Sequence, residues 1–268
     1  MKVAGSTYDE LVALREKTVH ERAKLAAASG DRSRLDMTAA HVLSLLERFP
    51  TLYREAWSTP SNAARPFARD GFDVGDGWFG IVERMSARLA ADPNLHVDQL
   101  KEQWGRLAVY LTPPGDAAAP APTVAGMPGE ELDRAIDEAE EESGRTCMVC
   151  GEPGTNEKRG RWVTVLCGPC VQLFDMAEAC RRVAERTKDL DFAAFSANEI
   201  AQDAVRLAMA SIGHAAACQP PGSRARLPGI EWERLGQSKD AATVKAVPVE
   251  DLWRFAIEEA PGLGRKLR

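Results

Sequence analysis

The sequence lacks the segments that would direct a protein into or across a membrane. Charged residues such as Glu10, Arg15 and Lys17 stand where a secretory signal would place its apolar stretch. No run of about 18 apolar residues occurs elsewhere in the chain. We therefore expect a cytoplasmic protein that makes no contact with a membrane.

Recognisable catalytic motifs and an overall basic charge are absent as well. The sequence contains no phosphate-binding loop, no Gly-x-Ser-x-Gly and no His-Glu-x-x-His. The four histidines have no spacing that suggests a metal site or a catalytic triad. A formal net charge of −6 gives no overall attraction to nucleic acid, so such a contact would need a local basic patch. These absences favour a protein that is not an enzyme.

Cysteines are few, but four of the six form two close pairs. Six are too few for a disulfide scaffold in a chain of 268 residues. Cys147 and Cys150 are separated by two residues, and Cys167 and Cys170 repeat this spacing after an interval of sixteen residues. Two such turns predict one tetrahedral Zn²⁺ site, because each turn can direct two thiolates at one ion. Four thiolates fill the coordination shell, so we expect the zinc to be structural.

The residues between the two cysteine pairs predict a zinc ribbon. Gly151 can supply the positive φ that a metal-binding knuckle needs, and Trp162 to Leu166 form a strand-like run. Lys158, Arg159 and Arg161 lie near the expected hairpin tip, where they could grip a phosphate backbone or simply face solvent. Trp162 could stack on a base if it were exposed.

Cys167 and Cys170 have a second interpretation. Cys-Gly-Pro-Cys between a strand-like and a helix-like run is typical of thiol–disulfide oxidoreductases. That fold also needs strands after the motif and a proline loop facing the disulfide, whereas the sequence after Cys170 predicts helices. The redox interpretation also leaves Cys147 and Cys150 unexplained, so the spacing favours zinc.

Hydrophobic periodicity predicts a mostly α-helical protein with small β-hairpins and an inserted four-cysteine zinc ribbon. Helical patterns occupy residues 8–27, 34–49, 78–92, 130–144, 171–190, 196–218 and 249–260. Residues 96–112 alternate after Trp104-Gly105 and predict a hairpin, with Leu107, Val109 and Leu111 on one face. Residues 219–247 have the composition of a loop.

Composition also divides the chain into segments. Residues 113–129, rich in Pro, Ala and Gly, predict a linker because they cannot build a core. It separates a helix and hairpin at 77–112 from the acidic helix and ribbon at 130–172. Helical segments at 1–57 and 173–268 flank these parts. We expect Cys180 and Cys218 to be buried thiols, and five tryptophans to lie in a core or a smaller cluster: Trp78, Trp104, Trp162, Trp232 and Trp253.

Several stretches follow one another in a familiar order. They are Gly77-Trp78-Phe79, Lys101-Glu102-Gln103-Trp104-Gly105, Thr146-Cys147-Met148-Val149-Cys150-Gly151 and the run from Trp162 to Cys167. This order, over about residues 77–170, resembles a family of small, mostly uncharacterised zinc-ribbon proteins of phage and bacterial genomes. Gln103-Trp104 replaces the family's Lys-Phe, and Cys170 replaces its last ligand, a histidine. The resemblance implies a fold and a metal, and no activity.

These observations together lead us to expect a non-enzymatic binding or adaptor protein of phage or mobile-element type. It would act through a protein partner, using helical faces and the acidic helix at 130–144. One alternative is a nucleic-acid-binding zinc ribbon that uses the basic hairpin turn. Another is a thiol–disulfide oxidoreductase with Cys167 and Cys170 as its active site.

Overall fold

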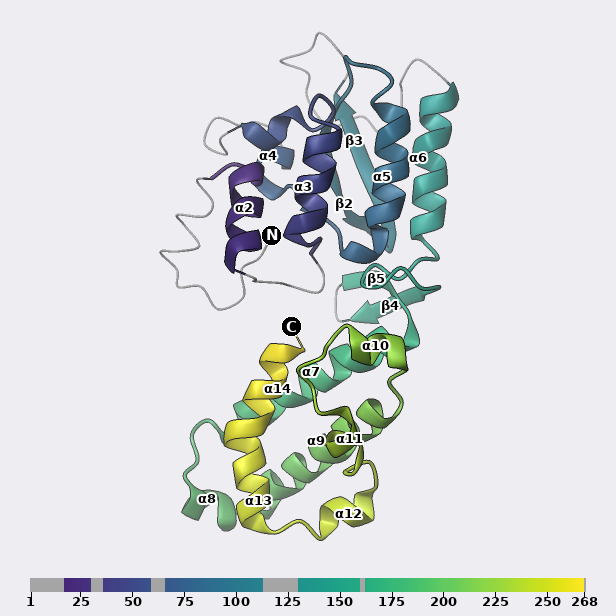
Figure 1. The fold of residues 1–268 in the computed structure, drawn as a ribbon. Helices are drawn as coiled ribbons and strands as arrows, with labels where there is room; N and C mark the ends of the chain where they lie inside the picture. The colour runs from purple at the N-terminus through teal and green to yellow at the C-terminus, as the bar shows by residue number, and fades with distance from the viewer. Residues whose placement is uncertain (1–16, 30–35, 59–65, 113–129, 160–161, 268) are drawn as a thin grey trace. The chain divides into compact units, whose positions relative to one another are not determined.

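The structure, a computed structural model, describes residues 17–29, 36–58, 66–112, 130–159 and 162–267 (Figure 1). The described chain is mostly helical, with two small sheets, as the sequence predicts. It divides into two units, Met1–Cys167 and Gly168–Arg268, and each has a hydrophobic core of its own. The predicted linker at 113–129 lies outside the described residues.

The first unit contains a three-stranded sheet. Its strands are β1 (Phe72–Asp73), β2 (His96–Gln103) and β3 (Arg106–Thr112), with β1 parallel and β3 antiparallel to the central β2. The predicted hairpin is confirmed, and Leu107, Val109 and Leu111 are all buried on the inner face. Strand β1 was not predicted, because two residues are too few to show an alternating pattern.

Trp104 and Gly105 form the two-residue turn between β2 and β3. Both residues have positive φ, 56° and 80°, as a type I′ hairpin turn requires. The Trp104 side chain is 73% exposed, so the prediction that it belongs to a core is wrong. The physical reason is its position: a residue in the turn extends beyond the paired strands, where no inner face can bury it.

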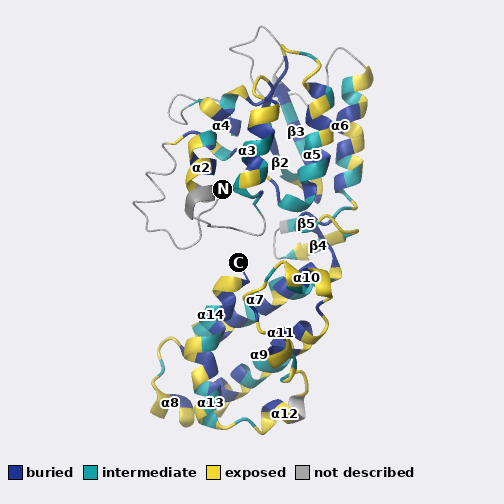
Figure 2. Ribbon diagram, in the orientation of Figure 1, coloured by how far each residue is buried: buried dark blue, intermediate teal, exposed yellow. Residues whose placement is uncertain are grey.

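Helices cover one face of this sheet. Figure 1 shows α3 and α5 in front of β2 and β3 with α6 beside α5, and Figure 2 shows that each of these helices has buried residues. Trp78 and Tyr53 are fully buried in the core between helices and sheet. The helices in the described part of the unit are α2 (Val19–Ser29), α3 (Ala39–Arg48), η1 (Arg54–Trp57), α4 (Pro66–Asp70), η3 (Asp76–Trp78), α5 (Phe79–Leu89) and α6 (Glu130–Ser143).

The first described helix begins later than predicted. Thr18 and Glu21 form a capping box: the Thr18 backbone N–H donates to the Glu21 carboxylate at 2.8 Å, and the Glu21 N–H donates to the Thr18 hydroxyl at 3.1 Å. Helix α2 therefore starts at Val19, and the helix predicted over 8–27 is not continuous through residue 18. Its earlier part lies outside the described residues. Helix α3 likewise begins at Ala39, five residues after the predicted start at residue 34.

The acidic helix α6 pairs with the neighbouring helix α5. Its apolar stripe, Ala135, Ile136 and Ala139, is buried. Its carboxylates contact two arginines of α5: Arg88 pairs with Glu131 and Glu138, and Arg84 pairs with Glu142. Each exposed pair contributes little stability. Together they neutralise part of the acidic face that we expected to meet a partner.

The second unit is entirely helical in its described residues. Its long helices α7 and α9 pack against each other, and α14 packs against α7. The elements are α7 (Gly168–Thr187), α8 (Phe192–Ser196), α9 (Glu199–Ala217), α10 (Pro221–Ala225), α11 (Trp232–Gly236), α12 (Ala241–Lys245), α13 (Val249–Arg254), the π-helix η4 (Phe255–Glu259) and α14 (Ala260–Lys266).

Two expectations for the second unit are wrong. Residues 219–247 contain the three short helices α10, α11 and α12, which are too short to show helical periodicity in the sequence. Cys218 is exposed, whereas Cys180 is buried as expected. Of the helices that the structure describes, none is long and apolar enough to cross a membrane.

Candidate metal centre

The residues between the two cysteine pairs form the predicted hairpin. Strands β4 (Thr155–Arg159) and β5 (Trp162–Leu166) are antiparallel, with Thr155 opposite Leu166 and Arg159 opposite Trp162. Residues 160 and 161, between the strands, lie outside the described part. The hairpin connects the first cysteine pair to the second, and its antiparallel strands bring the second pair back beside the first.

The first cysteine pair lies in a tight turn before β4. The Cys147 N–H donates to the Glu152 carbonyl at 2.8 Å, and the Gly151 N–H donates to the Cys147 carbonyl at 2.9 Å. Gly151 has a φ of 79°, as the sequence predicts for a metal-binding knuckle. These bonds fold the chain back on itself, so that both thiols can face one point.

The second cysteine pair lies where β5 passes into helix α7. Cys167 follows Leu166, the last residue of β5, and Cys170 lies in the first turn of α7. Pro169 suits this first turn, where a missing N–H costs no helical hydrogen bond. The positive end of the helix dipole also stabilises a thiolate at this position.

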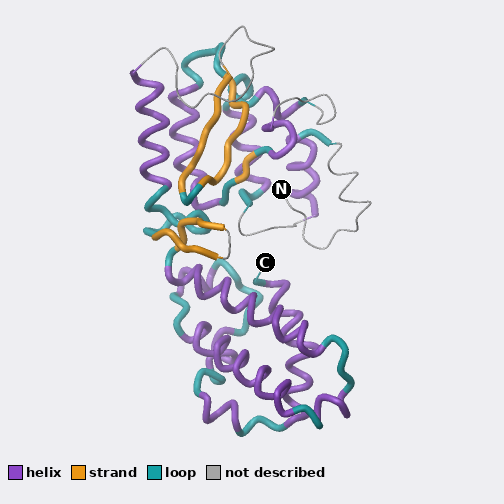
Figure 3. Tube along the Cα trace, turned by 180° about the vertical axis from the view of Figure 1, so that it is seen from behind, coloured by secondary structure: helices purple, strands orange, loops and turns teal. Residues whose placement is uncertain are grey.

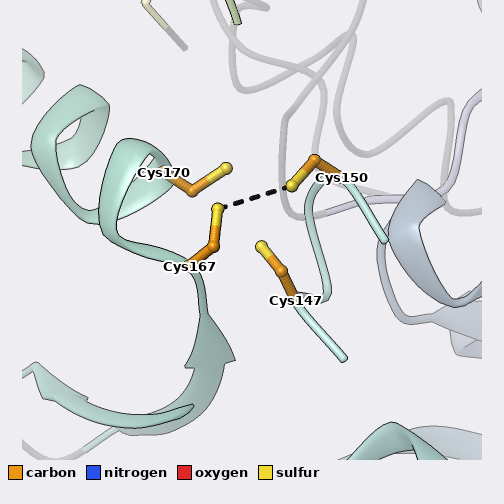
Figure 4. A group of neighbouring side chains, drawn as sticks. All are labelled: Cys147, Cys150, Cys167 and Cys170. Atoms are coloured by element: carbon orange, nitrogen blue, oxygen red, sulfur yellow. Dashed lines mark hydrogen bonds between the residues drawn. The ribbon is translucent and has the colours of Figure 1, made fainter. Parts of the chain in front are cut away.

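The four thiols of the two pairs converge on one centre (Figure 4). All four sulfur atoms lie within 4.8 Å of one another, and the Cys150 and Cys167 sulfurs are 3.5 Å apart. Sulfurs bound tetrahedrally at about 2.3 Å from Zn²⁺ are about 3.8 Å apart, so the cluster has the size that this ion needs. None of these cysteines forms a disulfide, and three are buried while Cys150 is half-buried.

The turn that contains Cys147 and Cys150, called the first knuckle below, is hydrogen-bonded to the core of the first unit. The Gly77 N–H donates to the Met148 carbonyl at 2.9 Å, and the Trp78 indole N–H donates to the Thr146 carbonyl at 2.7 Å. On the other side, the Met148 N–H donates to the Val165 carbonyl at 2.9 Å. Since Trp78 is fully buried in the core of the first unit, its hydrogen bond ties the knuckle to that core.

Two glycines allow this close contact between knuckle and core. A Cβ at Gly75 would lie 2.4 Å from the Met148 carbonyl oxygen, and a Cβ at Gly77 would lie 2.1 Å from the Cys147 carbonyl oxygen. Both distances are far below a normal contact. In the sequence, Gly77-Trp78-Phe79 appeared only as part of a family resemblance, with no structural role. The feature of the sequence that could have indicated this contact is the pair of glycines, Gly75 and Gly77, just before Trp78.

Asp76, between these glycines, organises the start of helix α3. Its carboxylate accepts the Thr38 backbone N–H at 2.7 Å and lies 2.7 Å from Nδ1 of His41. The His41 ring stacks on Phe79, with 3.9 Å between ring centroids. The spacing of the histidines in the sequence did not indicate this pairing, because it joins residues that only the fold brings together.

The predicted nucleic-acid residues are only partly described. Lys158 is exposed and Arg159 is half-buried, and as neighbours on β4 they point to opposite faces of the strand. Arg161 lies outside the described residues, and so does the side chain of Trp162, the first residue of β5. The described part of the ribbon therefore places one exposed cation, Lys158, on one face of β4.

Comparison with known proteins finds no relative of this chain. No protein-family model matches the chain, and neither a curated protein nor a solved structure shows significant similarity to it.

Proposed function

We propose that this chain is a non-enzymatic binding protein built around a structural zinc ribbon. One Zn²⁺ would be held by Cys147, Cys150, Cys167 and Cys170. The observation that carries the proposal is the convergence of the four sulfurs within 4.8 Å. Four thiolates complete a tetrahedral shell and leave no open position for water or substrate.

A structural role suits the surroundings of the cluster. Few side chains of the ribbon belong to a hydrophobic core. Met148 and Val165 are the two that lie in the core of the first unit. A small module with so little apolar burial needs another source of stability, and a structural zinc contributes about 10–16 kcal/mol to the folding of such modules. Bound thiols must stay reduced, so the cytoplasm is the compartment that we propose.

Thiol–disulfide exchange is the second candidate, because one observation favours it. Cys167 and Cys170 lie at a strand-to-helix junction, where oxidoreductases place this motif. Three features oppose it. Both thiols are buried, a second cysteine pair lies beside them, and no strand follows Cys170 within residues 170–267. A bound metal would also occupy both sulfurs.

A protein partner would bind through helix α9. Ile200 and Leu207 are 78% and 71% exposed and lie seven residues apart, so they share one face of the helix. Burying two such side chains contributes about 1.5–3 kcal/mol each. Glu199 and Asp203, both exposed, lie along one side of this stripe, and Asp203 also contacts Arg206 at 3.3 Å. The complementary partner is therefore an amphipathic helix with an apolar stripe edged by lysines or arginines.

The metal proposal is tested by native mass spectrometry of the purified protein. We expect one zinc per chain, lost in Cys150→Ser and kept in Cys218→Ser. A metal-free protein that reduces insulin disulfides would instead establish the oxidoreductase.

The partner proposal is tested by comparing variants in affinity capture. Leu207→Asp should lose proteins that the wild type and Leu25→Asp both retain, since Leu25 is an exposed leucine of the first unit. Equal capture by all three would contradict a binding role for α9. A concentration-dependent dimer that disappears in Leu207→Asp would show that the face binds a second copy, and would also overturn the proposed partner.

A further inference from the structure

The turn between β2 and β3 presents an aromatic side chain that the fold does not use. Trp104 is 73% exposed and has a φ of 56°. Among the described residues it is the one non-glycine with positive φ. Asn, Asp or Gly would take this position at lower cost. A large ring that is both conformationally disfavoured and unburied points to a use outside folding.

The outer face of the same hairpin has a matching chemistry. In Figure 3 the strands lie in front of the helices that cover their other face. Cross-strand pairing places six side chains on this outer face: Gln99, Lys101, Gln103, Arg106, Ala108 and Tyr110. They include two cations and one aromatic ring. On the same face of the sheet, Asp73 of β1 lies beside Lys101.

The aromatic ring of this face is fixed by its neighbours. The Tyr110 hydroxyl donates to Oε1 of Gln103 at 2.7 Å, and the Lys101 ammonium lies 5.0 Å from the centre of the Tyr110 ring. The Arg106 side chain is about half exposed; it extends toward the end of helix α6, where it lies near Gly144 and 3.9 Å from the Glu140 carboxylate. The face therefore combines an ordered ring with cations that can meet an anion.

The zinc ribbon adds a third cation next to the turn. The Asn156 side chain of β4 lies against Gly105, with its Oδ1 2.0 Å from where a Cβ of that glycine would stand. Asn156 and Lys158 are two residues apart on β4, so they share a face of the strand. Lys158 is therefore on the side of β4 that meets the turn.

We infer that the Trp104 surface, formed by Trp104, Lys101, Arg106, Tyr110 and Lys158, binds single-stranded nucleic acid. Exposed rings stack on unpaired bases of any sequence, and nearby cations contact the phosphates. A duplex offers no free base face to such rings. In a chain whose net charge is −6, this surface brings together three cations and two aromatic rings. This site is separate from the helix α9 face and goes beyond the proposed protein partner.

Fluorescence anisotropy with labelled oligodeoxythymidine and oligouridine tests this site. We expect saturable binding to both, which weakens as salt rises, and weaker binding to a duplex of equal length. Trp104→Asn should weaken binding by about 5- to 150-fold, the usual loss for one stacking ring, while an Asn-Gly turn keeps the hairpin. Lys158→Gln should reduce the slope of log affinity against log salt by about 0.7.

Matched variants separate binding from folding. Trp57→Asn removes another exposed tryptophan of the first unit, and Lys24→Gln removes another exposed lysine. Both should bind like the wild type. The inference is overturned if the wild type does not bind the oligonucleotides at low salt, if duplex binds as tightly, or if Trp104→Asn binds as well as Trp57→Asn. Loss of a captured protein in Trp104→Asn, with oligonucleotide binding unchanged, would reassign the surface to a protein and also overturn it.

Discussion

Gly77 and Cys147 are in such close contact that a Cβ at residue 77 would lie 2.1 Å from the Cys147 carbonyl oxygen. The same Cβ would lie 2.5 Å from the Gly151 nitrogen and 2.8 Å from the Cys150 nitrogen. All three are backbone atoms of the first knuckle, so they could move only if the knuckle moved. The segment before α5 therefore helps to position two of the four thiols.

Replacing Gly77 with alanine should damage the metal site without touching a ligand. The new methyl group would push the knuckle away from the core, and overpacking of this kind costs about 1–3 kcal/mol or more. We expect Gly77→Ala to lower the free energy of unfolding by about 3 kcal/mol and to weaken zinc binding. Urea unfolding and a competition titration with a zinc chelator measure the two effects.

Gly80→Ala is the matched control for this change. Gly80 lies three residues later in helix α5, and among the described residues its Cβ would meet just the flexible Arg84 guanidinium, at 3.3 Å. Alanine favours a helix over glycine by about 0.5–1 kcal/mol, so the variant should be as stable as the wild type or slightly more so. If Gly77→Ala behaves in the same way, the knuckle does not depend on the contact with residue 77.

Thiol reactivity should separate the six cysteines into three groups. Cys218 is exposed, whereas burial raises the pKa of the Cys180 thiol to about 11 and keeps it protonated. The other four thiols form the cluster. With a disulfide reagent at mildly alkaline pH, we expect one fast thiol in the zinc-loaded protein and five after addition of a chelator. Cys218→Ser should remove the single fast thiol.

A different count would contradict the zinc assignment. Two additional fast thiols before chelation, mapped by mass spectrometry to Cys167 and Cys170, would indicate an accessible dithiol of the oxidoreductase kind. A Cys180→Ser variant should leave the count of fast thiols unchanged in both states. It therefore serves as the control for a buried, unreactive cysteine.

Glu178 in helix α7 should stabilise the folded protein by a small amount that depends on pH. Hydrogen bonds from Arg181 and then Arg182 lower its pKa from 4.5 to about 2. Because the folded pKa lies below the unfolded one, the stabilisation is present above about pH 4.5 and is lost as the pH falls through about 2. The group is about a third exposed, so the contribution is below about 1 kcal/mol.

Glu178→Gln tests this contribution by thermal unfolding across pH. The variant should melt below the wild type at neutral pH, and the difference should vanish toward pH 2. The difference between the two proteins is the useful quantity, because acid releases zinc from both alike. If the difference in melting temperature between the two proteins is constant across pH, Glu178 stabilises the fold through packing and not through its charge.

The sequence could predict the parts of the site that depend on short spacings. Two residues between cysteines and a glycine after Cys150 define a knuckle locally, and the alternation of Leu107, Val109 and Leu111 defines a strand. Long amphipathic helices such as α5 and α9 were predictable for the same reason. In each case the pattern repeats within the element itself.

Contacts between distant segments could not be predicted from these patterns. Gly77 meets the knuckle about seventy residues later, and no periodicity links the two. The pairing of Asp76 with His41 depends on the placement of two helices. Trp104 was expected in a core from its residue type alone, whereas the turn that exposes it depends on the register of β2 and β3.

The conformation of Trp104 predicts that a variant can be both more stable and less able to bind. A left-handed φ costs an L-residue about 1–2 kcal/mol, and Asn tolerates it better than most. Trp104→Asn should therefore raise the free energy of unfolding by about 0.5–1 kcal/mol, whereas the β-branched Trp104→Ile should lower it. Urea unfolding followed by circular dichroism measures both. If Trp104→Asn is instead clearly less stable than the wild type, the ring packs against the fold, and the reason for assigning it to a ligand disappears.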